Sequence, residues 1–372
     1  MSRLPNLDIV SVSGSRLFRQ APYYSKIFQY PDLGMRSYGS SAYQMQARHT
    51  TSGSPNSKGF IDRVFNVVLN SLVRSMPRIT SLRTNLSKAD LLEHLDDEAF
   101  NLLPSAPLHT NAATFMGSLS ELHLDISLES QLVNKVENLT DHDHTFDTSN
   151  FGLRRLLAMT CSLQSLTLNF FGGETMEGHC EFTAWLSEPA SGSATGADDD
   201  DKETGNKSHT TIAWNPPPIA LPFLRRLVLQ GLFISPTQLR SVFTKFGSLK
   251  SAALHRVYLR RCFIDEPPVP EDSDEMENLW ASFFRGSSTT LAKLENLELD
   301  SLAVMQYRED PNDGVSVSTK DVDLVVFAPD EGSAEPPPNF KTVTNFRKDA
   351  LKKLAKETWL GRDVIAAVDQ GN

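Results

Sequence analysis

One spacing of apolar residues, at relative positions 0, 3, 6 and 8, recurs along the chain and constrains the fold more than any other feature. It is clearest in Leu221–Leu229, where leucines fill all four positions. Positions 6 and 8 flank a residue of the opposite face, as in a short strand with one buried side. Positions 0 and 3 suit the turn between a helix and that strand. The recurring frame therefore predicts a repeat architecture.

Seven copies of this frame occur, and three of them carry proline directly after position 0, which would stop a preceding helix. The copies at Leu221 and Phe246 begin 25 residues apart, within the period of about 20–29 residues that leucine-rich repeats have. The wider spacings require longer helices or insertions. The copies begin at Leu4, Met76, Met116, Thr160, Leu221, Phe246 and Leu291.

Helical patterns separate many of the copies. Ser235-Pro-Thr-Gln238 is a capping box with proline at the first helical position, which predicts a helix start. The combination predicts an α/β solenoid with a curved parallel sheet, helices on its convex side, irregular repeats and loop insertions. The other predicted helices are Phe60–Arg74, Ser87–Leu103, Phe151–Met159 and Asp274–Arg285.

The array is expected to cover residues 1–305. Segments near 34–59 and 187–218 have compositions rich in Ser and Gly, or in Asp and Pro, which predict disordered insertions. Residues 306–372 would form a C-terminal flank with a short strand, loops over Tyr307–Val322 and Asp330–Pro338, and a basic amphipathic helix over Asn345–Trp359.

Composition restricts the partners and the compartment. The net charge of −10 argues against general binding to nucleic acids or anionic membranes, which require a basic face. No apolar run approaches the ~20 residues that span a bilayer, and the N-terminus lacks the pattern of a signal peptide. Three widely spaced cysteines fit free thiols. We therefore expect a cytoplasmic or nuclear protein.

Catalytic and metal-binding motifs are weak. His142 and His144 alternate as strand ligands of a metal would, but no third ligand stands at a set spacing, so a polar loop is favoured. Gly172-Gly173 suits a turn after a strand. The sequence has no nucleotide-binding fingerprint and no nucleophile elbow. We expect no enzyme, cofactor or metal.

The strongest candidate site follows from the geometry of a repeat array. Residues that alternate with the buried leucines would line the concave face of the sheet, where such arrays bind partners. Their mixed character favours a protein partner, although a simply wetted sheet face is an equal alternative. The candidates are Arg83, Asn85, His123, Asp125, Thr167, Asn169, Val228, Gln230, Ala253, His255, Glu298 and Asp300.

Residues 1–305 resemble leucine-rich-repeat proteins of the F-box-associated kind common in filamentous fungi. The segments that carry the resemblance are Met76–Leu82, Leu119–Leu124, Leu163–Leu168, Leu221–Leu229 and Leu291–Leu299. Such proteins often begin with an F-box, and this sequence shows no such segment before the frame at Leu4. The chain is then a truncated product, a fragment of a longer protein, or a repeat protein without the module.

The resemblance implies a protein–protein interaction module, with the repeats as the substrate-recognition part of an SCF-type ubiquitin ligase. Docking to the Skp-type adaptor is not supported without an F-box. Two alternatives stay open. One is a hydrolase-like enzyme on an irregular α/β fold, and the other is a truncated product with no retained function.

Overall fold

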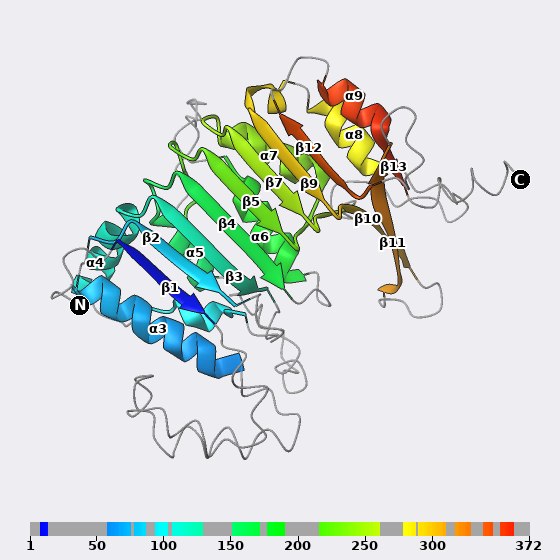
Figure 1. The fold of residues 1–372 in the computed structure, drawn as a ribbon. Coiled ribbons are helices and arrows are strands. Elements are labelled where there is room, and N and C mark those ends of the chain that lie inside the picture. The colour runs from blue at the N-terminus through cyan, green and yellow to red at the C-terminus, as the bar shows by residue number, and fades with distance from the viewer. Residues whose placement is uncertain are drawn as a thin grey trace, which may run out of the picture.

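The structure is a computed structural model. It describes residues 8–13, 58–75, 78–86, 94–102, 106–128, 151–171, 177–189, 216–260, 278–287, 289–309, 317–328, 338–344 and 350–360. Within these residues the chain forms a mixed α/β fold around a large, mostly parallel sheet (Figure 1). None of the helices in these residues is both long and apolar enough to cross a lipid bilayer. Most of the predicted insertions at 34–59 and 187–218 lie outside the described residues, and residues 58–59 of the first belong to the helix α3 (Lys58–Ser75).

The large sheet has eight strands that lie side by side in the order in which they occur in the chain. All neighbouring pairs are parallel except the last, in which β12 runs antiparallel to β9. The strands are β1 (Ile9–Ser13), β2 (Ser81–Asn85), β3 (Glu121–Ser127), β4 (Ser165–Phe171), β5 (Arg226–Gln230), β7 (Ser251–His255), β9 (Asn296–Asp300) and β12 (Phe340–Thr344).

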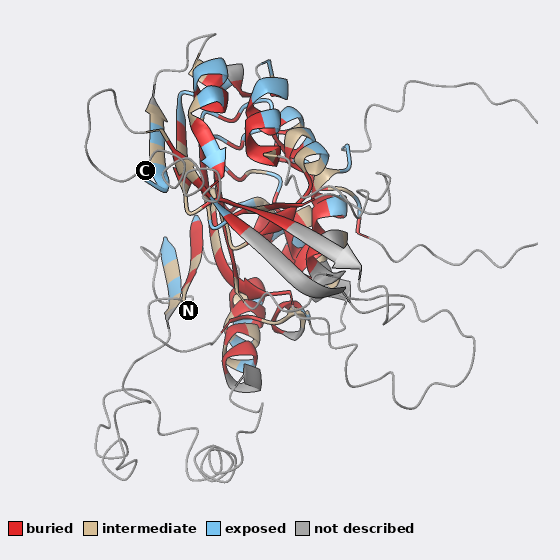
Figure 2. Cartoon of the chain, turned by 90° about the vertical axis from the view of Figure 1, so that its right-hand side faces the viewer, coloured by how far each residue is buried: buried red, intermediate tan, exposed pale blue. Residues whose placement is uncertain are grey.

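Helices α5, α6 and α7 lie behind this sheet in Figure 1, and its other face is turned toward the viewer. Figure 2 shows the buried residues gathered between the sheet and the helices, with exposed residues on the outer sides of the helices. The helices are α3 (Lys58–Ser75), α4 (Ala106–Gly117), α5 (Phe151–Ala158), α6 (Glu177–Ser187), α7 (Pro236–Lys245), α8 (Leu279–Gly286) and α9 (Ala350–Glu357).

The apolar frame sets the register of the sheet. Position 6 of each copy pairs with position 6 of the next, through Val10, Leu82, Leu122, Leu166, Leu227, Ala252 and Leu297. Every described frame residue from Ile79 onward is buried, whereas Val10 and Val12 on the edge strand β1 are partly buried. Each buried leucine stabilises the fold by about 1.5–3 kcal/mol. The rows thus form a continuous core beneath the sheet.

Backbone hydrogen bonds join the copies where the strands begin. The Gln164 carbonyl accepts from the N–H groups of Arg225 and Arg226, at 2.8 and 3.0 Å, and the Arg225 carbonyl accepts from those of Lys250 and Ser251, both at 2.9 Å. The same two-donor pattern recurs at Asp8, Thr80, Ser120 and Lys250. Each copy therefore satisfies backbone groups of the next.

Two predicted helices are confirmed, and the predicted capping box is present. Helix α3 covers the predicted segment Phe60–Arg74, and α5 covers the predicted segment Phe151–Met159 except for its last residue. At the start of α7, Ser235 Oγ accepts from the Gln238 N–H at 3.1 Å, and Gln238 Oε1 accepts from the Ser235 N–H at 3.1 Å. Helices α4 and α6 were not predicted, because their apolar residues follow no clear one-sided period.

The prediction of one helix over Ser87–Leu103 is wrong for its described residues. Leu95 forms a parallel bridge with Ile126, and only a 3-10 turn, η5 (Asp97–Phe100), follows. The Asp97 carboxylate accepts from the N–H groups of Gly152 and Leu153, at 3.0 and 2.9 Å. This segment is thus held by the N-terminus of α5 instead of forming its own helix. Residues 87–93 lie outside the described part.

Helix α8 begins later than the predicted start at Asp274. Asn278 is its N-cap and its Oδ1 accepts from the Ala281 N–H at 3.0 Å. Residues 274–277 lie outside the described residues. The amide of Asn278 therefore sets the helix start that the sequence pattern placed in the acidic run.

A left-handed residue ends each of the last three parallel strands and leads into a second sheet. Gly231, Arg256 and Ser301 have φ values of 69°, 51° and 51°. After each one the chain enters β6 (Phe233–Ile234), β8 (Tyr258–Arg260) or β10 (Ala303–Glu309). The second sheet has the order β13-β11-β10-β8-β6, with β11 at Val317–Phe327 and β13 at Thr358–Leu360.

This second sheet corrects the loop predicted over Tyr307–Val322. Tyr307 belongs to β10, which pairs antiparallel with β11. Strands β10 and β11 follow the last copy of the apolar frame, so the frame does not reveal their pairing. Residues 310–316 between the two strands lie outside the described part.

The C-terminal flank contacts the large sheet. In β12, Val343 stands opposite Leu297 and Lys341 opposite Leu299, so a lysine joins the row of frame position 8. Lys341 Nζ lies 3.4 Å from Glu357 Oε2 at the end of α9. Helix α9 lies inside the predicted segment Asn345–Trp359 and packs against α8.

The left-handed glycine yields a test of the fold. A Cβ at Gly231 would lie 2.1 Å from the Phe170 carbonyl oxygen. We expect Gly231→Ala to lower the free energy of unfolding by about 3 kcal/mol or more, because it adds this clash to the cost of a positive φ. Thermal unfolding should show a Tm lowered by more than about 6 °C.

Gly247→Ala is the matched control, since a Cβ there meets nothing closer than Lys293 Nζ at 3.9 Å. Its unfolding free energy should stay within about 1 kcal/mol of the parent. Equal effects of the two substitutions would contradict the kink at Gly231.

Candidate functional site

The face of the sheet opposite the helices carries the predicted site residues in two rows across the strands. The first row runs through Arg83, His123, Thr167, Val228, Ala253 and Glu298, each paired with the next. The second row runs through Asp125, Asn169, Gln230, His255 and Asp300 in the same way, and Asn85 occupies its position in β2. All twelve predicted residues therefore alternate with the buried frame residues along their strands, as predicted.

Exposure divides these residues into two groups. Eight are half-buried and reach solvent: Arg83, Asn85, His123, Thr167, Gln230, His255, Glu298 and Asp300. Four are buried, which corrects the expectation that all of them line an accessible face. Asp125 is 0% exposed, Asn169 6%, and Val228 and Ala253 7% each.

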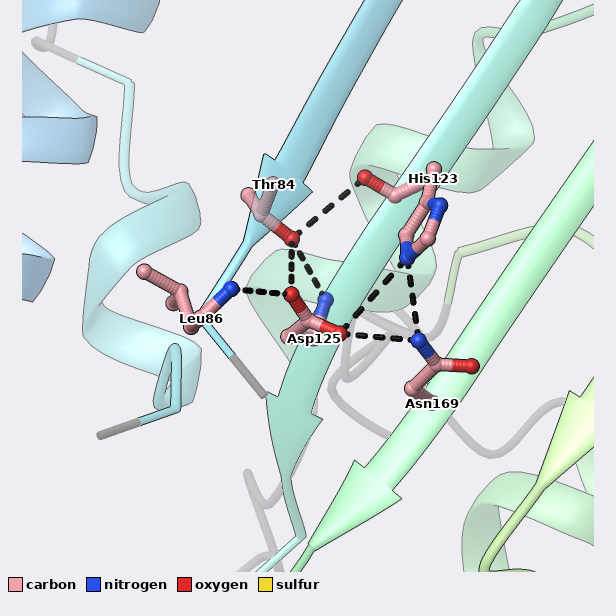
Figure 3. Close-up of polar contacts among 5 residues, drawn as sticks. All are labelled: Thr84, Leu86, His123, Asp125 and Asn169. Atoms are coloured by element: carbon pink, nitrogen blue, oxygen red, sulfur yellow. Dashed lines mark hydrogen bonds and ion pairs between the residues drawn. The ribbon is translucent and has the colours of Figure 1, made fainter. Parts of the chain in front are cut away.

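Asp125 is buried because neighbouring strands supply its hydrogen bonds (Figure 3). Its Oδ2 accepts from the Leu86 N–H at 2.7 Å and from Thr84 Oγ1 at 3.2 Å, and its Oδ1 accepts from Asn169 Nδ2 at 2.8 Å. The Asp125 N–H donates in turn to Thr84 Oγ1 at 2.7 Å. A buried carboxylate is tolerated only with such partners.

His123 stands at the solvent side of this cluster. Its Nε2 lies 2.9 Å from Asn169 Nδ2 and 3.6 Å from Asp125 Oδ1. An amide nitrogen can only donate a hydrogen bond, so Asn169 Nδ2 is the donor toward the His123 ring. Asn169 thereby links the ring to the carboxylate.

Burial alone raises the pKa of Asp125, but the nearby His123 ring and the hydrogen bonds from the Leu86 N–H and the Asn169 amide outweigh it. The pKa of Asp125 therefore lies below its ordinary value of 3.8. Of these donors, the Leu86 N–H and the Asn169 amide lie within hydrogen-bond distance. The cluster thus holds a permanent negative charge beneath the polar face at neutral pH.

The arrangement differs from that of a hydrolytic triad. In a triad the histidine bridges the nucleophile and the acid. Here the Thr84 hydroxyl contacts the Asp125 carboxylate directly, and His123 contacts Asn169. In the described residues no group of three or more His, Cys, Asp or Glu side chains could hold a metal ion. His142 and His144 lie outside those residues.

Ser81 and Glu121 add a third row that the sequence reasoning missed. Arg83 forms an ion pair with Glu121 of β3, and Arg83 Nε donates to Ser81 Oγ at 3.0 Å. Farther along, His255 Nε2 lies 3.3 Å from Glu298 Oε1. Ser81 and Glu121 stand one alternation before the predicted rows. Extending the period by two residues toward each strand start would have identified them.

Comparison with known proteins leaves the chain without an assigned family. No protein-family model matches the sequence, and a search of the curated proteins finds no match.

The buried aspartate yields a test that separates a structural residue from a surface residue. We expect Asp125→Asn to lower the free energy of unfolding by about 2 kcal/mol at neutral pH, because the new amide nitrogen opposes donors on both sides. Asp300→Asn makes the same change at the corresponding position of β9, which is half-buried, and should cost less than about 0.5 kcal/mol.

The pH dependence follows from the lowered pKa of Asp125. A carboxyl whose pKa is lower in the folded than in the unfolded protein stabilises the fold at pH values above its unfolded-state pKa. This stabilisation is lost as the pH falls through its folded-state pKa. The difference in the free energy of unfolding between the parent protein and Asp125→Asn should therefore become smaller below about pH 4. Urea unfolding at several pH values measures it, and a constant difference down to pH 2 would contradict the assignment.

Proposed function

We propose that the chain is a leucine-rich-repeat solenoid that acts as a protein–protein interaction module through the polar face of its large sheet. The observation that carries this proposal is the in-register series of half-buried polar side chains across β2, β3, β4, β5, β7 and β9. A sheet buries its apolar face against another layer, here the helices. An uncovered polar face on a repeat array is typical of a binding surface.

The dimensions of the face suit a segment of another protein. Strands lie about 4.8 Å apart, so the six strands that carry the polar series extend about 24 Å, roughly the length of a 16-residue helix. The side chains that reach solvent include both charge signs, as in the pair of Arg83 with Glu121. Such a face favours a partner with alternating charges and amides over a uniformly charged one.

The buried cluster supports this function by holding the face rigid. Asp125 joins β2 and β3 to β4 through Leu86, Thr84 and Asn169. A pre-organised surface loses less conformational entropy on binding. His123 and Thr167, which pair beside this cluster, are thus presented on a fixed support.

Substrate recognition for an SCF-type ubiquitin ligase is the more specific form of the proposal. It rests on the resemblance of residues 1–305 to F-box-associated repeat proteins. In this form the polar face selects the protein to be modified, and another module contacts the adaptor. The two parts of the proposal are tested separately.

The binding face is tested with bulky substitutions on opposite sides of the protein. We expect Thr167→Arg combined with Gln230→Arg to reduce recovery of specific partners at least tenfold in quantitative affinity purification from the native cells. The pair Ser241→Arg and Thr244→Arg, on the exposed side of α7, is the matched control. Both variants should keep the parent Tm. Equal recovery by the two variants would contradict the proposed face.

The ligase role is tested by the identity of the co-purified proteins. We expect the intact chain to recover a Skp-type adaptor within a larger complex, and the polar-face variant to retain that adaptor while losing substrates. Quantitative mass spectrometry of both samples measures this. Recovery of partners with no adaptor would reject the ligase role and leave the interaction module standing.

A further inference from the structure

A groove with a volume of about 570 Å³ lies along the edge of the large sheet where the strands begin. Gln164, Arg225, Lys250 and Glu295 line it, and each of them directly precedes a strand, β4, β5, β7 or β9. Phe223 and Lys293, which precede β5 and β9, also line it. The groove is thus built by equivalent positions of four successive copies and is separate from the polar face.

The charge of this groove is opposite to that of the chain. Three of its residues are cations, Arg225, Lys250 and Lys293, against one anion, Glu295, whereas the whole chain carries −10. Lys250 Nζ lies 2.6 Å from Glu295 Oε1, and both side chains are more than half exposed. Such an exposed pair contributes little stability and exchanges easily for another anion.

Two of these cations are available for a ligand. Within the described residues, the Arg225 and Lys293 side chains take part in no hydrogen bond or ion pair, and both are exposed. The backbone N–H groups of Arg225 and Lys250 are already bound to the preceding copy. Recognition in the groove therefore falls to side chains, and these carry positive charge.

The groove also has an apolar element and a fixed shape. Phe223 is 60% exposed, the most exposed of the large hydrophobic residues in the described part. Ser248 Oγ donates to the Pro222 carbonyl at 2.7 Å. This hydrogen bond joins two neighbouring copies that line the groove. Beside it, Gly247 leaves open space, with Lys293 Nζ as the nearest atom to a Cβ there.

We propose that this groove binds an acidic peptide segment of a partner protein, with its carboxylates on Arg225, Lys250 and Lys293 and one apolar side chain against Phe223. The groove crosses four strands, about 14 Å, which corresponds to about four extended residues. The short run favours a peptide over a nucleic acid, whose binding requires a longer basic face than three cations supply. This surface is independent of the polar face and stands whether or not that face binds a partner.

The test uses the full chain and a defined probe, a fluorescein-labelled peptide of about ten residues with glutamates around a central Leu-Phe pair. We expect saturable binding by fluorescence anisotropy that weakens at least tenfold when salt rises from about 50 to 500 mM. Arg225→Glu combined with Lys293→Glu should weaken binding at least tenfold. Arg74→Glu combined with Lys352→Glu makes the same charge change at exposed cations on α3 and α9 and should alter binding less than twofold.

Two further variants and one altered probe separate the parts of the proposal. Phe223→Ser and a probe with Ala-Ala in place of Leu-Phe should each weaken binding severalfold, because the apolar contact is lost. Gly247→Leu, which fills the groove without changing its charge, should also weaken it. Equal binding by the two charge-reversal variants would overturn the site. Binding of single-stranded DNA as tight as that of the peptide would overturn the peptide as its ligand.

Discussion

The structure depends on the register of the apolar frame from one copy to the next. Frame positions 6 and 8 of neighbouring copies lie opposite each other, so their leucines form continuous rows under the sheet. The Gln164 and Arg225 carbonyls, which bind two N–H groups each, hold the same register from the backbone. A slip by one residue would turn the leucines of a strand to solvent and its polar residues into the core. Because the buried leucines fix the register of each strand, the residues that alternate with them form the polar rows on the other face.

The sequence pattern predicted the parts of the fold that repeat. Spacing alone placed Leu227 beside Leu166 and Ala252, and it placed Thr167 and Gln230 on the opposite face. The capping box at Ser235 predicted the start of α7 because every group in it lies within four residues of chain. Local or periodic chemistry of this kind is readable without a structure.

Contacts between residues far apart in the sequence could not be predicted from local patterns. Asp125 occupies a position at which the pattern expects an exposed polar side chain, but Thr84 and Leu86, about 40 residues earlier, bury it with hydrogen bonds. Asp97 lies in a segment with helical spacing, yet it caps a helix that begins more than 50 residues later. The candidate site was therefore predicted as a surface, and the fixed support beneath it was not. The groove at Arg225 was missed because its residues fall between the apolar positions.

The ion pair of Lys341 with Glu357 has a consequence for assembly. Lys341 occupies the place in β12 where the row of frame position 8 would otherwise continue, and β12 runs against the direction of β9. A further copy added at this edge would have to bury the charge of Lys341 without a leucine opposite it and would meet a strand of the wrong direction. The β12 edge is therefore expected to disfavour end-to-end stacking of molecules on this side. A lysine in the apolar row thus marks the edge at which the repeated pairing of parallel strands ends.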